Sequence, residues 1–314
     1  MYRIGVDIGG TNIKIGLVDE DLAITARSSI PFPHLSGEEV AAKIAAEIRR
    51  LLAANNIPEQ ELESIGVVIP GSIDPTGSII LDAYNLNFHD VPFQAQMQAQ
   101  FNNLPVFLAN DADGACLAEL GRGAFVGCHA AVLMTLGTGV GGGLIIDGKM
   151  YNGGQHQGVE LGHMPLVAGG EHCTCGNDGC IEAYCSASAL KRDGIRAMKE
   201  HPDSILSQKS NGNEDLVDAK FVIDCAKAGD PVANAVFDRY AQYLAYACVS
   251  MVHLLDPEVI AFGGGVCLAG DFLFDAIRKH VKKKTFFRNQ AKIVPAVMGN
   301  DAGMIGAAML SRNA

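Results

Sequence analysis

The feature that most constrains the fold of this chain is a unit of strand, glycine-rich turn and strand that occurs twice. In the first copy, a strand-like run at 2–6 leads into Asp7-Ile8-Gly9-Gly10-Thr11, and residues 12–18 then alternate between apolar and polar. In the second copy, strands at 130–137 and 144–150 flank the turn GTGVGGG. Alternation with period two indicates a strand after the glycines, so both turns are predicted to be hairpins. The repeat predicts two related α/β halves.

The rest of the chain supplies helices between further strands. Helical patterns occupy 38–54, 93–103, 186–199, 218–228, 231–255 and 271–284, and strands are predicted at 64–71, 105–111 and 257–262. This order is typical of helices that cover a sheet in each half. We predict a smaller N-terminal α/β domain over 1–115, joined by a C-terminal helix at 301–314, and a larger α/β domain over 116–300.

The first glycine turn does not fit a dinucleotide-binding loop. That loop needs a third glycine and a following helix, whereas here a strand follows. The backbone N–H groups of the turn and the Thr11 hydroxyl can surround a phosphate, and Asp7 can hold Mg²⁺. A plain β-hairpin with permissive glycines is the alternative.

The second turn, from Leu136 to Gly143, favours the phosphate interpretation, because two such hairpins can grip a polyphosphate from both sides. Gly263-Gly264-Gly265, after a third strand, offers bare backbone on which a flat ring can lie. Together these glycine segments indicate a nucleotide site.

Asn110 and Asp111 stand at the end of an apolar strand. A carboxylate there can accept the proton of a substrate hydroxyl during phosphoryl transfer. The two residues are also typical of an Asx turn or a helix N-cap, and both interpretations stay open at this point.

His163, Cys173, Cys175 and Cys180 form a Cys₃His set within 18 residues of irregular, glycine-rich sequence. Four such ligands suit a tetrahedral, structural Zn²⁺ with no open position. A group of free buried thiols is the alternative. A structural ion here would orient its neighbours Glu160 and Glu182, whose carboxylates can accept hydrogen bonds from sugar hydroxyls.

Composition excludes several classes of function. The net charge of −11 argues against nonspecific binding to DNA or to anionic membranes. Nine cysteines, an odd and mostly scattered set without a signal segment, do not suggest a disulfide framework. No run is long and uncharged enough to span a bilayer, so a soluble, cytoplasmic protein is expected.

The combined motifs resemble the ROK family of sugar kinases, relatives of actin and hexokinase. The resemblance rests on DIGGTNIKIGLVDED, AND at 109–111, LGTGVGGG, ELGH, CTCGNDGCIE and FGGGV, and runs from residue 3 to the helix DAGMIGAA. It implies a two-domain, actin-like (ribonuclease H-like) ATPase fold with nucleotide and sugar in the interdomain cleft. It also implies an ATP-dependent hexose kinase that needs Mg²⁺ and forms homodimers or homotetramers.

The resemblance assigns roles residue by residue. It implies that Asp111 is the general base acting on a sugar hydroxyl, usually the 6-OH. Sugar contacts are implied for Gly71, Asn110, Glu160, His163 and Glu182, with one ring nitrogen of His163 on zinc and the other toward the sugar. The nucleotide would be lined by Asp7, Gly9, Gly10, Thr11, Asn12, Lys14, Gly137, Thr138, Gly139, Gly264 and Gly265.

The identity of the sugar is left open by the residues themselves. YNLNFHDVPF at 84–93 resembles members of the family that act on glucose, which makes glucose the first expectation. Allose, fructose, mannose and N-acetyl-hexosamines are the alternatives. A non-catalytic sugar-sensing regulator is the rival from another class, although Asp111 and both hairpins argue against it. Family repressors carry an N-terminal DNA-binding module, for which the strand starting at residue 2 leaves no room.

Overall fold

The protein is described here as a computed structural model covering residues 1–102, 104–155, 158–288 and 290–313. The chain divides into two compact units. The first comprises Met1–Gly127, Gly143–Val159 and Val297–Ala314, and the second comprises Cys128–Gly142 and Glu160–Ala296. The chain therefore leaves the first unit, returns to it briefly and ends in it. Each unit is described by itself below.

The first unit is built on a five-stranded sheet of order β3-β2-β1-β4-β8. Its strands are β1 (Tyr2–Ile8), β2 (Asn12–Val18), β3 (Ile24–Pro31), β4 (Leu62–Ile69) and β8 (Val106–Asn110). The pair β1–β2 is antiparallel, whereas β4 runs parallel to both β1 and β8. The predicted strands at 2–6 and 12–18 are confirmed, and the first glycine turn is the hairpin between them.

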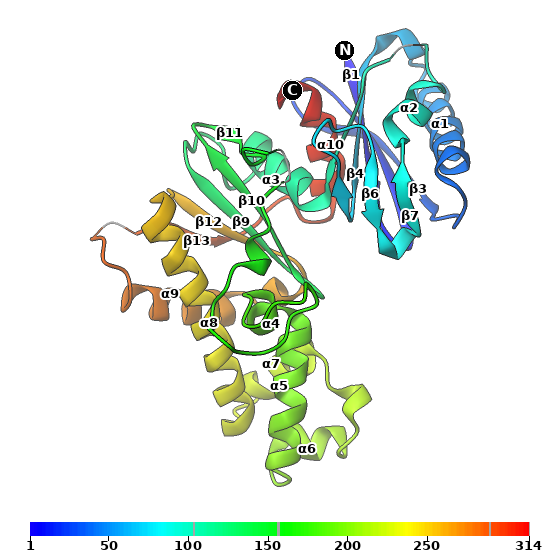
Figure 1. The fold of residues 1–314 in the computed structure, drawn as a ribbon. Coiled ribbons are helices and arrows are strands. Elements are labelled where there is room, and N and C mark those ends of the chain that lie inside the picture. Colours follow the sequence, from blue (N-terminus) through cyan, green and yellow to red (C-terminus); the bar gives the residue numbers. More distant parts are fainter. Residues whose placement is uncertain (103, 156–157, 289, 314) are drawn as a thin grey trace. The chain divides into compact units, whose positions relative to one another are not determined.

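Successive side chains of each strand point to opposite faces of this sheet. One face carries a continuous apolar core that includes Ile4, Val6, Ile13, Ile15, Ile65 and Val67. The core is shared with α1 (Gly37–Ala54) and α2 (Phe93–Gln98), and a small sheet joins it: β5 (Ser72–Ile73), β6 (Ile80–Ala83) and β7 (Phe88–Val91). The helix predicted at 93–103 ends at Gln98 among the described residues, and residue 103 lies outside them. Figure 1 shows α1 and α2 beside one face of the sheet and α10 (Ala302–Asn313) beside the other.

Glycines allow α10 to approach the opposite face at backbone distance. A Cβ added at Gly5 of β1 would lie 1.8 Å from the carbonyl oxygen of Met304, and one at Gly66 of β4 would lie 1.7 Å from that of Ala307. On the helix itself, a Cβ at Gly306 would lie 1.7 Å from the carbonyl oxygen of Gly114 in α3 (Asp111–Arg122). The helix therefore packs on the sheet and on α3 through its backbone, where no side chain fits.

The second unit is built on the sheet β11-β10-β9-β12-β13. Its strands are β9 (Ala131–Leu136), β10 (Val140–Ile146), β11 (Lys149–Met150), β12 (Val259–Gly263) and β13 (Lys292–Pro295). The part of β10 from Gly143 onward and all of β11 belong to the segment assigned to the first unit. The strand β12 is parallel to β9 and to β13. The second glycine turn is again a hairpin between strands, as predicted.

Helices complete the second unit. They are α4 (Glu182–Cys185), α5 (Ala187–Glu200), α6 (Ile205–Ser210), α7 (Ala219–Lys227), α8 (Pro231–Leu255) and α9 (Asp271–Lys282). The structure confirms the helices predicted at 186–199, 218–228, 231–255 and 271–284 to within two residues at each end. In the described part of the chain, no helix combines the length and apolar character needed to cross a bilayer. The cytoplasmic location expected from the sequence stays a prediction.

Candidate functional site

In the first unit, the carboxyl ends of parallel strands bring predicted site residues to one edge of the sheet. Asp7 of β1 pairs with Val68 of β4, and Ile69 of β4 pairs with Asn110 of β8. Neighbouring strands are about 4.8 Å apart, so Asp7 and Asn110 stand roughly 10 Å from each other across the sheet. In open α/β sheets this edge is where ligands bind.

The first hairpin closes with a hydrogen bond from the Gly9 N–H to the Asn12 carbonyl oxygen, at 2.9 Å. Gly10 has open space around its Cβ position, and Gly10, Thr11 and Asn12 are exposed. The free edge of this turn is accessible, as a phosphate-binding loop requires.

Asp7 is half-buried beside the start of α10 and pairs with a cation from the hairpin. Lys14 Nζ lies 3.3 Å from Asp7 Oδ2, and the side chains of Lys14 and Asp7 are 39% and 20% exposed. A Cβ added at Gly303 in the first turn of α10 would lie 2.5 Å from Asp7 Cγ. The first turn of a helix favours negative charge, which suits a carboxylate in this place.

Asn110 has the N-cap role that was left open from the sequence. Its side-chain oxygen accepts a hydrogen bond from the Ala112 N–H at 2.8 Å, and its Nδ2 donates to the Gly71 carbonyl oxygen at 2.8 Å. Asp111 follows as the first residue of α3 and is exposed. The N-cap is therefore Asn110 and not Asp111, which stands in the first turn of α3 next to the edge of the sheet. The catalytic role expected for Asp111 stays a prediction.

The second unit also has a sheet edge at which glycine-rich segments follow parallel strands. Thr135 of β9 pairs with Gly263 of the parallel strand β12, so the hairpin after β9 and the glycines after β12 emerge side by side. Gly264 has φ of +90°, and a Cβ there would lie 2.4 Å from the Leu136 carbonyl oxygen. This position therefore requires glycine on both conformational and steric grounds. The structure places Gly137, Thr138 and Gly139 next to Gly264 and Gly265, and their role in binding a nucleotide stays a prediction.

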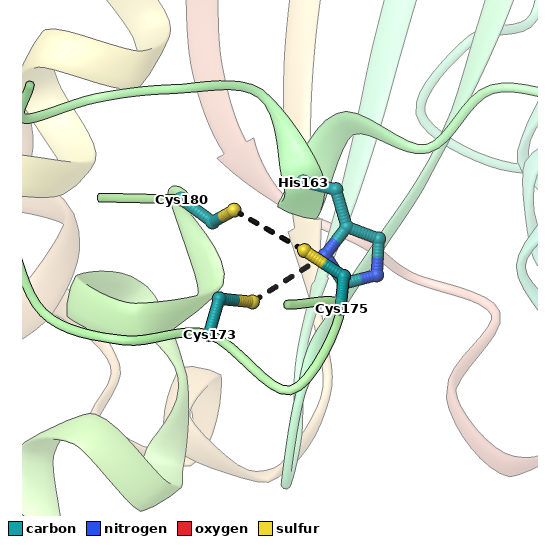
Figure 2. A group of neighbouring side chains, drawn as sticks. All are labelled: His163, Cys173, Cys175 and Cys180. Carbon is teal, nitrogen blue, oxygen red and sulfur yellow. Dashed lines mark hydrogen bonds between the residues drawn. The ribbon is translucent and has the colours of Figure 1, made fainter. Parts of the chain in front are cut away.

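The predicted metal ligands also converge, as Figure 2 shows. His163 comes from a short 3-10 turn (Leu161–His163), and the three cysteines come from the loop before α4. The four ligand atoms lie within 4.8 Å of one another. Cys173 Sγ is 3.6 Å from His163 Nδ1, and Cys175 Sγ is 3.6 Å from Cys180 Sγ.

These separations fit a tetrahedral ion. With Zn–S bonds of about 2.3 Å and a Zn–N bond of about 2.0 Å, the edges of a tetrahedron are roughly 3.5–3.8 Å long. All nine cysteines are free thiols in the described structure, so no disulfide competes for the sulfurs. Because Nδ1 of His163 faces the sulfurs, Nε2 is the ring nitrogen left for another partner.

The thiols differ in how readily they ionise without metal. A hydrogen bond from the backbone of Asn177 lowers the pKa of Cys175, which is exposed. Burial and the neighbouring thiols Cys175 and Cys173 raise the pKa of Cys180 to about 12. Since metal ligation needs thiolates, an ion bound here would displace protons from Cys180 above all.

Glu160 and Glu182 differ in their surroundings. Glu160 is exposed and precedes the turn that carries His163. Glu182 Oε2 accepts a hydrogen bond from the Val140 N–H at 2.9 Å, and its Oε1 accepts one from Thr174 Oγ1 at 3.1 Å. Sequence reasoning missed this contact between the cysteine loop and the second hairpin, because nothing in the sequence around residue 182 points to residue 140.

Comparison with known proteins places this chain in a class and then in a family. The chain has two sheets, each with a glycine hairpin at one edge, and its fold matches solved sugar kinase structures over almost its whole length. It therefore has the two-domain actin-like fold expected from the sequence. The chain belongs to the ROK family, whose sequence model matches residues 3–314.

Several relatives cover almost the whole chain. A glucokinase of Thermotoga maritima is 35% identical over 311 residues, which are 98% of this chain and 96% of the relative. A glucokinase of Halalkalibacterium halodurans is 34% identical over 313 residues, which are 98% of this chain and 94% of the relative. An N-acetylmannosamine kinase of Vibrio cholerae is 29% identical over 309 residues and covers 98% of both chains.

A solved structure carries ligands. The ROK family glucokinase of Streptomyces griseus in complex with glucose and AMPPNP is 32% identical, with a TM-score of 0.79 and 100% coverage of both chains.

Proposed function

We propose that this protein is an ATP-dependent hexose kinase that converts glucose to glucose 6-phosphate. The observation that carries the proposal is the position of Asp111, an exposed carboxylate at the sheet edge that also bears Asp7 and the first glycine hairpin. The chain belongs to the ROK family and is 34–35% identical to two glucokinases, which supports the same activity.

Asp111 acts as the general base. Phosphoryl transfer depends mainly on positioning and on neutralising charge, so the protein must hold a sugar hydroxyl in line with the terminal phosphate. A carboxylate at the start of α3 can accept the hydroxyl proton as the new P–O bond forms. Asn110 keeps this carboxylate in place by capping the helix and binding the Gly71 carbonyl oxygen.

The two glycine hairpins bind ATP. The Gly9 and Gly137 N–H groups close their own turns, so the N–H groups of Gly10, Thr11, Thr138 and Gly139 are the ones that donate to phosphate oxygens. Gly264 and Gly265 present bare backbone to the base. Asp7 would hold Mg²⁺, whose preference is for carboxylate and water oxygens, and the ion would neutralise phosphate charge.

The Cys₃His cluster is a structural zinc site. His163, Cys173, Cys175 and Cys180 would supply all four ligands, so the ion organises the loop and leaves no position for a substrate. Asn110, Glu160, the Nε2 of His163 and Glu182 are proposed to contact the sugar hydroxyls, next to the turn at Gly71.

An N-acetyl-hexosamine is the second candidate substrate. It is favoured by the similarity to the N-acetylmannosamine kinase of Vibrio cholerae over 98% of both chains. Turnover of glucose and N-acetylmannosamine at equal concentrations, followed by ADP release, decides between the two. A kcat/KM at least about tenfold higher for the N-acetyl sugar would replace glucose in the proposal.

A matched pair of carboxamide variants tests the general base. Asp111→Asn removes the proton acceptor and is expected to lower kcat by at least about 100-fold while glucose still binds. Asp113→Asn makes the same chemical change two residues further along α3, about 200° around the helix, and is expected to retain turnover. Equal turnover in the two variants would refute the role of Asp111.

We also propose that the chain forms homodimers or homotetramers. Large apolar side chains on the second unit support association: Leu254 is 70% exposed and Phe286 is 86% exposed. Light scattering during gel filtration measures the mass in solution. A monomer at micromolar concentration would contradict the proposal.

A further inference from the structure

The second glycine hairpin is held by the segment that follows the metal loop. Val140, the first residue after the turn, donates its N–H to Glu182 Oε2 at 2.9 Å. The same carboxylate lies against Gly139, where an added Cβ would be 2.3 Å from Glu182 Oε2. The side chain of Glu182 therefore packs directly under the turn.

Two further contacts fasten the turn to the start of α5. The Ala187 N–H donates to the Gly137 carbonyl oxygen at 2.8 Å, and Ser188 Oγ donates to the Thr138 carbonyl oxygen at 2.8 Å. Because both carbonyl groups accept hydrogen bonds from α5, the backbone of the turn is held in one orientation.

The other oxygen of Glu182 faces the cysteine loop. Oε1 accepts a hydrogen bond from Thr174 Oγ1 at 3.1 Å and lies 3.8 Å from Cys173 Sγ. Thr174 stands between two of the predicted ligands, and Glu182 follows Cys180 by two residues. One carboxylate thus bridges the metal loop and the hairpin.

We propose that Glu182 is a positioning residue that couples the metal state of the Cys₃His cluster to the nucleotide hairpin. With zinc bound, the loop fixes Thr174 and Glu182, and Glu182 fixes Val140 and Gly139 so that the turn is ready for phosphate. Without zinc the loop loosens and ATP binds more weakly, even when no sugar is present. The inference rests on the proposed function, because it assumes that this hairpin binds ATP.

The expected size follows from the bond that is lost. A hydrogen bond between a backbone N–H and a carboxylate is among the stronger ones, so its loss from a prearranged site weakens ligand binding by about tenfold. If Glu182 carries the coupling, zinc removal and truncation of Glu182 remove the same interaction, and their effects do not add.

Calorimetric titration with AMPPNP and Mg²⁺, without sugar, tests the proposal on four proteins. They are the wild type, Glu182→Ala, Glu182→Gln and Glu171→Gln, each zinc-loaded and after chelation. We expect the dissociation constant to rise about tenfold in zinc-loaded Glu182→Ala and to be largely restored in Glu182→Gln, which keeps an acceptor oxygen. Chelation should weaken binding by the wild type but add little in Glu182→Ala.

Glu171→Gln is the matched control. Glu171 lies in the same loop and pairs with Arg196 on α5, without contact to the hairpin. Its variant should bind AMPPNP like the wild type. Thr174→Val, which keeps Glu182 and all four metal ligands, provides a milder test if Glu182→Ala does not fold, and a two- to threefold loss is expected.

Amide hydrogen exchange supplies a readout that is independent of nucleotide. The Val140 amide should exchange faster in Glu182→Ala and in the chelated wild type than in the zinc-loaded wild type. An unchanged nucleotide affinity in folded Glu182→Ala, with an effect on glucose binding alone, would overturn the inference and leave the proposed function intact. A wild type that binds no AMPPNP would instead overturn the proposed function.

Discussion

Substituting Gly66 by alanine tests how the C-terminal helix is joined to the first sheet. Gly66 lies in the middle of β4, and its added Cβ would be 1.7 Å from the carbonyl oxygen and 2.4 Å from the carbonyl carbon of Ala307 in α10. Both contacts involve backbone atoms, so no side-chain rotation can relieve them. Either α10 or β4 has to move.

The size of the effect follows from this displacement. A carbon and a carbonyl oxygen need at least about 3 Å, so the helix must withdraw by more than about 1 Å. Overpacking a core by one methyl group costs about 1–3 kcal/mol, and a contact between rigid backbones belongs at the upper end of that range. We therefore expect a loss of about 3 kcal/mol, or roughly 6–12 °C in Tm for a unit of this size.

Thermal unfolding followed by circular dichroism measures this loss, with Gly154→Ala as the matched control. Gly154 also lies in the first unit, and its Cβ position has open space. The control should be neutral or slightly stabilising, since alanine has fewer unfolded conformations than glycine. If the Tm of Gly66→Ala equalled that of Gly154→Ala, the close approach of α10 to β4 would be refuted.

Other predictions concern single side chains. Glu119, 1% exposed, accepts hydrogen bonds from three backbone N–H groups, so Glu119→Ala should destabilise the first unit by about 3 kcal/mol in urea unfolding. For Asp74, burial raises the pKa, but hydrogen bonds from Thr76 and nearby backbone lower it to about 2. Because the pKa of Asp74 is lowered in the folded state, its ionised carboxylate stabilises the fold above pH 3.8, and this stabilisation is lost as the pH falls through about 2. Asp74→Asn should therefore cost about 1 kcal/mol at pH 7 and progressively less as the pH falls through this range. Elemental analysis should find one zinc per chain, and much less in Cys180→Ser; a full equivalent in that variant would contradict the ligand set.

The helices and strands that depend on local sequence patterns could be predicted from the spacing of apolar residues. The alternation of Ile13, Ile15 and Leu17 reappears as the core-facing side of β2, because period two places these residues on one face. Ser36 and Glu39 form the capping box of α1, which begins at Gly37, one residue before the predicted start at 38. Such signals lie within a few residues of the structure that they specify.

The cysteine spacing predicted a cluster for a similar reason. His163 and the three cysteines lie close along the chain, and glycines permit the tight turns between them, so proximity in sequence implied proximity in space. The positive φ of Gly176 and of Gly179, at 90° and 83°, is the geometry that this loop requires.

Contacts between distant segments were not predictable from one sequence. The small sheet β5–β7 consists of strands of two to four residues, too short to show a period. The bond between Glu182 and Val140 spans 42 residues, and Glu182 was expected only as a sugar ligand. Glu119 was not singled out, because a glutamate in an amphipathic helix looks like a surface residue until its partners at 297 and 298 are placed.

The central claim is that this protein transfers the γ-phosphate of ATP to glucose, and following that phosphate is the most direct test. Zinc-loaded protein is mixed with Mg²⁺, glucose and ATP labelled with ³²P at the γ-phosphate. The labelled sugar phosphate is counted, and the unlabelled ADP is measured in the same samples by a coupled assay. The account predicts equal amounts of ADP and glucose 6-phosphate, and formation of both at least about 100-fold slower in Asp111→Asn under the same conditions. ADP formed without labelled sugar, or a folded, ATP-binding protein that phosphorylates no hexose, would contradict it.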